Sequence, residues 1–407
     1  MNRIAKVLLT LALATSFGFA QEPAAKQKQT PPPGSAPKPF KVPARQRFTL
    51  PNGMRVTLVP YGTMPKVMVS ARVRAGLLNE PMDKTSVGDF VVELMKEGTK
   101  TRSAEKIAEE ASSMGGVLDV GAGADQSTVS LDVLSEFGPK AVELLADVIQ
   151  NPIFPNEDFE RIRNDKLRET EIARSRPQTL ANERFRKVLY GDHPYSRILP
   201  TEANLKGMTL DDVKKFYDEN FSAARTDLYV AGKFDPAAVK SAIEASFKNW
   251  KKGSDAVLDV PKIAGKKSLD FIDRPGAAQS TIYMGLPALD PSNPDYVPAI
   301  VMNALLGGSF GSRVTANIRE QHGYTYSPFS SLSVRYRDGY WVQVADVTTA
   351  VTGPAIKEIF NEINRLRSEP PTDAEMQGIK NYLAGVFVLQ NSSRQGLIGQ
   401  LAFVDLH

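Results

Sequence analysis

The sequence contains no cysteine, which excludes disulfide bonds and metal sites built from thiolates. Histidine is also scarce: the chain has His193, His322 and His407, and no two of them are spaced like a pair of metal ligands on one helix. Positive and negative side chains nearly balance, with 50 Lys and Arg against 46 Asp and Glu, and no stripe of basic and aromatic residues occurs. We therefore expect neither nucleic acid nor an acidic membrane surface as the main partner.

The first twenty residues have the pattern of a secretory signal peptide. Arg3 and Lys6 precede an apolar run from Val7 to Phe17, and Gly18-Phe19-Ala20 resembles a cleavage site. The run is shorter than the roughly 20 residues that span a membrane, and because no Cys follows Ala20 we expect no lipid anchor. A buried N-terminal helix is the alternative, but a Pro-rich stretch follows directly. We expect export to the bacterial periplasm, with no membrane span after removal of residues 1–20.

Residues 21–45 are rich in Pro and Lys and almost free of large apolar side chains, so we expect a disordered linker there. Folded sequence begins at Gln46. The remaining chain is ample for more than one domain. Pro51-Asn52-Gly53 indicates the turn of a hairpin, and alternating apolar residues predict strands. Expected strands are 67–74 and 127–133, and expected helices are 85–95, 103–113, 138–150 and 156–174.

The same order of elements returns in the second half. Gly353-Pro354 opens a helix as Gly138-Pro139 does, and the two helix starts are 353 − 138 = 215 residues apart. Pro371 and Pro155 each precede a further helix, and they are 371 − 155 = 216 residues apart. Expected second-half elements are strands at 280–285 and 340–347, a helix at 296–306, and two helices opened by Gly353 and Pro371. We expect two similar α+β domains, each an antiparallel-rich sheet with helices packed on one face. The expected limits are 46–250 for the first domain, 251–266 for a linker and 267–407 for the second domain.

Several strings in this order resemble the pitrilysin/insulinase family of zinc metallopeptidases, and the resemblance covers about 46–407. They are FTLPNG at 48–53, LYGDHPY at 189–195, GGSFGSR at 307–313, IRE at 318–320 and GYTYS at 323–327. The similar members are short bacterial and mitochondrial-processing-type chains. The resemblance implies two such domains arranged as half of a clam-shell. Family members usually continue beyond the helix that contains Tyr382, so the sequence is either a fragment or has a short second domain.

Catalytic members of that family carry His-x-x-Glu-His on a helix of the first domain and a further Glu some seventy residues later. Two imidazoles four residues apart can reach one zinc ion, while the intervening Glu activates its water. At the matching positions this chain has Asp89, Val92 and Glu93, and the distal position is kept as Glu169. The resemblance therefore implies a degenerate site without zinc in this chain. A carboxylate-only cation site at Asp89, Glu93 and Glu169 is one alternative. Solvated carboxylates paired with Lys96 or Arg168 are the other.

The second domain keeps a different pair of the family's residues. Members carry an Arg and, seven positions on, a Tyr that bind substrate carbonyls and the tetrahedral oxyanion, and Arg319 and Tyr326 stand at this spacing. The structural alternative is that Arg319 pairs with Glu320 or another surface acid and that Tyr326 packs at the start of a strand. In the family, peptide also adds to a sheet edge, for which 117–120 and 127–133 are candidates.

Loss of the zinc motif with retention of the Arg/Tyr pair is typical of the non-catalytic partner in two-chain family members. We therefore expect a subunit of a periplasmic peptidase heterodimer, whose homologous partner holds the zinc and whose substrate is a peptide or unfolded polypeptide. A non-enzymatic peptide-binding or scaffold protein of the same fold is the alternative. Catalysis through a carboxylate-only metal site ranks third. The substrate's identity and length, and whether the partner is a second copy or another chain, are not encoded in these patterns.

Overall fold

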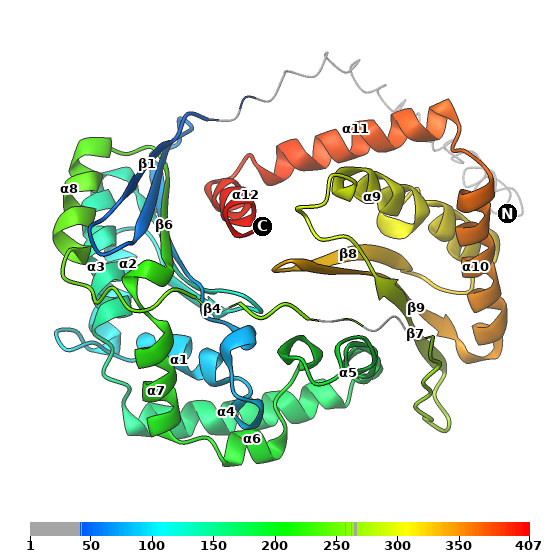
Figure 1. Ribbon diagram of the computed structural model, residues 1–407, viewed down its shortest axis with the longest axis horizontal. Helices are drawn as coiled ribbons and strands as arrows, with labels where there is room; N and C mark the ends of the chain where they lie inside the picture. The colour runs from blue at the N-terminus through cyan, green and yellow to red at the C-terminus, as the bar shows by residue number, and fades with distance from the viewer. Residues whose placement is uncertain (1–40, 42, 257, 262, 264–266) are drawn as a thin grey trace, which may run out of the picture. The chain divides into compact units, whose positions relative to one another are not determined.

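The computed structural model describes residues 41, 43–256, 258–261, 263 and 267–407 (Figure 1). The expected signal peptide and nearly all of the expected linker at 21–45 lie outside these residues, so both stay predictions. In the described part of the chain no helix is long and apolar enough to cross a membrane. The expected domain limits likewise stay predictions, although the described residues between 251 and 266 contain no helix or strand.

The first domain is built on a six-stranded sheet in the order β1-β2-β6-β3-β5-β4. Its strands are β1 (Gln46–Thr49), β2 (Arg55–Pro60), β3 (Lys66–Val73), β4 (Leu118–Ala122), β5 (Ser127–Leu134) and β6 (Thr226–Gly232). Only β2 and β6 run parallel, and all other neighbours are antiparallel. The expected hairpin is confirmed: β1 and β2 flank a turn in which Gly53 has φ 90°, a conformation that favours glycine.

The described residues of the first half contain eight α-helices, of which α1 to α4 were expected from the sequence and α5 to α8 were not. They are α1 (Val87–Met95), α2 (Ala104–Ser113), α3 (Gly138–Gln150), α4 (Asn156–Arg174), α5 (Pro177–Tyr190), α6 (Glu202–Lys206), α7 (Leu210–Asn220) and α8 (Pro236–Phe247). Alternate residues of β3, such as Val67 and Val69, face the same core as the apolar sides of α1, α3 and α8. Period-two strands thus bury one side against period-3.6 helices, as the patterns predict.

The second domain has a three-stranded sheet in the order β7-β9-β8. Its elements are β7 (Gln279–Pro287), α9 (Tyr296–Asn303), β8 (Phe329–Arg335), β9 (Asp338–Thr348), α10 (Thr352–Ser368), α11 (Asp373–Gln390) and α12 (Arg394–Leu406), with π-helical segments at Ala304–Gly308 and Thr315–Gln321. The order β7-β9-β8 repeats β3-β5-β4 of the first sheet, which supports the expected repeat. Residues 267–407, all described, contain no counterpart of β1, β2 or β6, so within them β7 pairs on one side only.

Two helices pack on the sheet of the other half of the chain. On α5, Tyr190 donates a 2.5 Å hydrogen bond to Asp338 at the start of β9. On α12, Leu397 and Ile398 pack against Tyr229 of β6 (Figure 1). The expectation of helices on one face holds for the main core, but α12 lies on the opposite face of the first sheet. The reason is that Val59, Met68, Tyr229 and Ala231 present apolar side chains on that face, which need cover as well.

Candidate functional site

The remnant of the zinc motif lies on α1, whose start is fixed by a buried carboxylate. Glu80 accepts hydrogen bonds from the backbone N–H of Ser86 (2.7 Å) and of Gly88 (3.0 Å). A side chain at position 88 would meet the Glu80 carboxylate, because a Cβ built there lies 3.0 Å from Glu80 Oε1. Burial raises the pKa of Glu80 to about 7, although the two N–H donors oppose this rise. Glu80 therefore supplies the capping hydrogen bonds of α1, because the N-cap residue, Ser86, makes no side-chain capping hydrogen bond.

Asp89, Glu93 and Glu169 are the three carboxylates at the remnant of the zinc motif. Burial raises the pKa of Asp89; Lys166 and Ser86 oppose the rise, and the charges of Glu93 and Glu169 add to it. Val92, at the position of the general base, is 2% exposed and belongs to the core. An apolar side chain there cannot accept or release a proton.

An ammonium group stands beside these carboxylates. Lys166 on α4 lies 4.0 Å from Glu93, and its Nζ lies 5.9 Å from the centre of the Phe90 ring. Among the described residues no group of three His, Asp or Glu side chains is placed to hold a metal ion. The residues present do not fit zinc: no imidazole is available, Val92 is apolar, and a cation already neutralises part of the carboxylate charge.

Lys96 and Arg168, the two expected partners of these carboxylates, make different ion pairs. Lys96 lies 3.5 Å from Glu93, so this pairing is confirmed. Arg168 pairs instead with Asp165 at 2.6 Å, so its assignment to the carboxylate cluster is wrong. Lys166 was missed, although its position three residues before Glu169 puts both side chains on one face of a helix.

Arg319 and Tyr326 are brought together by the turn that joins the π-helical segment 315–321 to β8. The N–H of Tyr324 donates to the carbonyl of Ile318 at 2.8 Å, and the Thr325 hydroxyl donates to the carbonyl of Asp346 at 2.7 Å. Ile318 is fully buried, so the segment that carries Arg319 is anchored in the core. The loop that carries Tyr326 is thereby tied to both the helix and β9.

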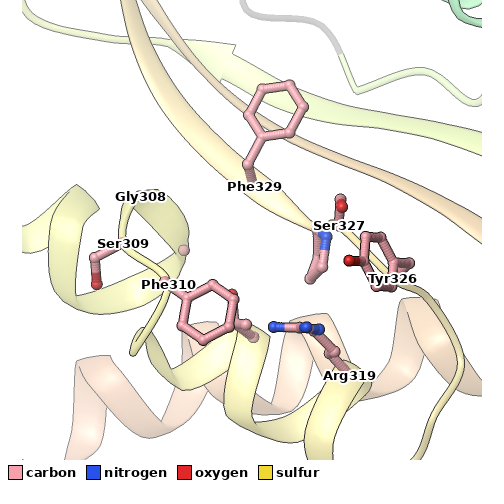
Figure 2. A pocket seen from close by; sticks show the side chains of 10 residues that line it. Gly308, Ser309, Phe310, Arg319, Tyr326, Ser327 and Phe329 are labelled. Atoms are coloured by element: carbon pink, nitrogen blue, oxygen red, sulfur yellow. The ribbon is translucent and has the colours of Figure 1, made fainter.

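The Arg319 guanidinium lies between two aromatic rings, as Figure 2 shows. Its central carbon is 4.5 Å from the ring centre of Phe310 and 5.2 Å from that of Tyr326, both within the range of cation–π attraction. Nη1 lies 3.2 Å from a Glu320 oxygen, yet no partner satisfies the hydrogen-bond geometry of this buried atom. The alternative pairing of Arg319 with Glu320 is thus partly right. Packing of Tyr326 into a strand is wrong, because its side chain is 80% exposed.

A cavity of about 270 Å³ opens beside this pair, lined by Gly307 to Phe310, Thr315, Arg319 and Tyr326 to Phe329. The glycines are needed for close approach. A Cβ at Gly307 would lie 2.6 Å from both Gln343 Oε1 and Ser330 Oγ, and one at Gly308 would lie 2.4 Å from the Asn303 amide nitrogen. This explains the Gly-Gly string physically, because a larger residue would push the loop off the sheet.

The two candidate segments for peptide addition, 117–120 and 127–133, lie at β4 and β5 and differ in their pairing. β5 is paired on both sides, with β3 and with β4, so it cannot accept a further strand. Within the part of the chain that the structure describes, β4 pairs with β5 alone and lies at an edge of the sheet. Of the two candidate segments, only the one that includes β4 can bind a peptide by strand addition.

Fold and site together define a two-domain, peptidase-like α+β protein whose zinc-ligand positions cannot hold zinc. Two family models match the chain: "Insulinase (Peptidase family M16)" over residues 56–201 and "Peptidase M16 inactive domain" over 207–383. The chain belongs to the insulinase-type M16 peptidase family.

Relatives and solved structures agree with this assignment. An uncharacterized zinc protease of Rickettsia felis is 28% identical over 336 residues, which are 82% of this chain and 81% of the relative. The beta subunit of mitochondrial-processing peptidase from Saccharomyces cerevisiae is 25% identical over 368 residues, 86% of this chain and 79% of the relative. The structure of a peptidase M16 inactive domain from Pseudomonas fluorescens matches with a TM-score of 0.81 and 23% identity, covering 89% of this chain and 88% of that chain. A Helicobacter pylori protease matches with a TM-score of 0.82 and 20% identity, covering 88% of each. These structural matches show the fold.

Proposed function

We propose that this chain is the non-catalytic subunit of a periplasmic insulinase-type metallopeptidase. A homologous partner subunit holds the zinc, and Arg319 and Tyr326 bind the substrate carbonyl and the developing oxyanion where the two subunits meet. The observation that carries the proposal is the contrast between the two half-sites. Lys166 offsets part of the negative charge at the zinc remnant, whereas Arg319 and Tyr326 both line an open cavity.

The chemistry of Arg319 and Tyr326 suits an oxygen that gains negative charge. A guanidinium N–H and a phenol are both strong donors, and the two aromatic rings hold the guanidinium in place before substrate arrives. Such preorganised donors stabilise a transition state without having to reorganise during the reaction. The relative named as a subunit of mitochondrial-processing peptidase supports a two-subunit assembly. The signal-peptide pattern supports export.

The proposal is tested by tagging the mature chain in its native host and identifying co-purifying periplasmic chains by mass spectrometry. A homologous chain with an intact His-x-x-Glu-His motif is expected. In a peptide-cleavage assay of that complex, Arg319→Ala or Tyr326→Phe should each lower kcat by about 10²–10³. Exposed residues of the same types, Arg367 and Tyr382, supply the matched controls Arg367→Ala and Tyr382→Phe. Isolation of the chain alone, or unchanged kcat in both site variants, contradicts the proposal.

A non-enzymatic peptide-binding or scaffold role is the second candidate. The open edge of β4 and the cavity beside Arg319 favour it, because neither feature requires zinc to bind a peptide. In this case Arg319→Ala and Tyr326→Phe leave the cellular function unchanged. If the isolated chain has peptidase activity that depends on Asp89 or Glu169, this result would instead support catalysis through a carboxylate-only metal site.

A further inference from the structure

The outer face of the first sheet, opposite the main core, has an apolar half and a charged half. Apolar residues of α12 cover the first half. In the charged half, Asp227 of β6 is the register partner of both Arg55 on β2 and Arg72 on β3. Arg72 in turn lies opposite Thr128 of β5. Because residues that are directly opposite share a face, these four side chains form one polar row across four strands.

The arginines of this row share a single carboxylate. Asp227 accepts hydrogen bonds from Nε and Nη2 of Arg55, and Nη2 of Arg74 lies 3.5 Å from the same carboxylate. The Asp227 side chain is 6% exposed, so its charge acts at short range and is little screened. Three guanidinium groups, those of Arg55, Arg72 and Arg74, thus surround one negative charge. The row carries an excess of positive charge.

Arg72 has the fewest partners in this row. Its Nη1 donates a 2.9 Å hydrogen bond to the Thr128 hydroxyl, and among the described residues no carboxylate pairs with it. Arg225, a buried arginine that likewise has no ion pair in the described chain, donates three hydrogen bonds, to Asn220 and Ser254. A half-buried guanidinium with one neutral acceptor is therefore unusual within this protein.

Burial makes the lack of a counter-charge costly. It lowers the pKa of Arg72 because the charged form is poorly solvated there, and Tyr229 and the exposed Asp119 only oppose this fall. A guanidinium nevertheless stays protonated, so an anion is needed to balance it. The row can be reached from solvent: the Arg74 side chain is 21% exposed, and a cavity of about 240 Å³ extends to Arg55 and Asp227.

We propose that Arg72, assisted by Arg74, binds a carboxylate group of a ligand on the outer face of the first sheet. A carboxylate carries one charge and matches the planar fork of a guanidinium, whereas the second charge of a phosphate would face the nearby Asp227. The carboxylate can belong to an acidic polypeptide or to a small organic acid. The site is separate from Arg319 and its cavity, so it does not rest on the proposed function.

Fluorescence anisotropy of the mature chain with two labelled peptides tests the site. Both are amidated, Ser/Gly-rich decapeptides, one with three Glu and the other with three Gln. At about 50 mM salt the Glu peptide should bind about tenfold more tightly, because hydrogen bonds to charged groups are the stronger ones. Arg72→Gln should reduce this preference to about twofold or less. Arg367→Gln removes an exposed arginine of α10 and the same charge, and should leave the preference unchanged.

Calorimetric titration with succinate and with inorganic phosphate distinguishes the sources of the anion. Binding of succinate that is lost in Arg72→Gln, without a preference between the peptides, supports the site and assigns it to small organic acids. Tighter binding of phosphate than of succinate overturns the assignment to a carboxylate. If neither the Glu peptide nor succinate shows binding that depends on Arg72, the site itself is overturned.

Thermal unfolding separates a binding role of Arg72 from a structural one. Arg72→Met removes a half-buried charge that has no carboxylate partner, so it should keep or raise Tm while it abolishes binding of the anion. A lower Tm together with lost binding would mean that Arg72 stabilises the sheet, and would overturn its role as a binding residue. Failure of the proposed function, seen as unchanged cleavage in Arg319→Ala, leaves these results unaffected.

Discussion

Lys166 Nζ lies 4.0 Å from the Glu93 carboxylate, on the helix that faces α1. The Lys166 side chain is 15% exposed, so its charge is less screened than that of a surface lysine. A family member that carries the His-x-x-Glu-His motif has a His at the position of Glu93, and there a divalent metal supplies the positive charge. In this chain, Lys166 supplies positive charge from its own helix. Lys166 therefore offsets part of the carboxylate charge at the positions that match the family's zinc ligands.

Lys166→Ala should destabilise the protein at neutral pH by about 1–3 kcal/mol, because buried Asp89 then lacks a compensating cation. Without Lys166 the pKa of Asp89 rises further. A carboxyl whose folded pKa is raised contributes stability that is lost as pH increases, so the difference from wild type should grow above about pH 4. Chemical denaturation at pH 4 and pH 7.5 measures this difference in the free energy of unfolding between wild type and variant. Lys96→Ala, which removes the more exposed partner of Glu93, is the control and should cost less than about 0.5 kcal/mol. A loss in Lys166→Ala that does not depend on pH contradicts the electrostatic role.

Glu80 should make stability fall as pH rises from about 4.5 to about 7. Its folded pKa is raised to about 7, so the folded state binds the proton more tightly than the unfolded state across this window. The upper bound of this loss is about 3 kcal/mol. Glu80→Gln, which stays neutral, should flatten that part of the pH profile. The exposed Glu109→Gln is the control and should leave the slope unchanged.

Contacts of α12 with the first sheet should depend on apolar packing more than on charge. Arg394 makes a bidentate pair with Asp132 at 2.8 and 3.0 Å, but the carboxylate side chain is 37% exposed, so Arg394→Ala should cost about 1 kcal/mol or less. Ile398 is fully buried, and Ile398→Ala should cost about 2–5 kcal/mol. Amide exchange of α12 and thermal unfolding compare the stabilities of the Arg394→Ala and Ile398→Ala variants. A larger loss of stability in Arg394→Ala than in Ile398→Ala would contradict this prediction.

Gly307→Ala should distort the wall of the cavity, because the added Cβ would lie 2.6 Å from Gln343 Oε1 and Ser330 Oγ. Relief of this overlap should cost about 1–3 kcal/mol and weaken peptide binding. Gly311→Ala is the matched control in the same loop, since nothing lies within 4 Å of its built Cβ. It should change stability by less than about 0.5 kcal/mol. Equal effects of the two substitutions would mean that close approach does not shape the cavity.

Much of the local structure could be predicted from periodicity. Strands β3, β5 and β9 and helices α3, α4 and α10 lie within a few residues of their expected bounds. Turn and capping residues such as Gly53 and Thr372 mark element ends through local hydrogen bonds and φ values, which depend only on nearby residues. The candidate pair Arg319 and Tyr326 came from the resemblance to the family, in which an Arg and a Tyr stand at this spacing.

The parts that could not be predicted involve contacts between residues far apart in the sequence. Lys166 was missed because its importance depends on α4 packing against α1. The exposure of Tyr326 and the position of β4 at an edge likewise depend on what lies beside them in space. Placement of α12 on the second face of the sheet required knowing that Tyr229 and Ala231 were left to be covered.

The sequence by itself determined several of the strands and helices, the internal repeat, the small number of histidines and the Arg/Tyr spacing, because each is written in short-range order along the chain. Only the tertiary structure decided that Lys166 offsets part of the carboxylate charge at the remnant of the metal site and that Arg319 lies between two rings. It also decided that β4, among the described residues, lies at an edge of the sheet. The physical reason is that charge neutralisation, burial and hydrogen-bond satisfaction depend on neighbours in space, which the pattern of residues along the chain does not specify.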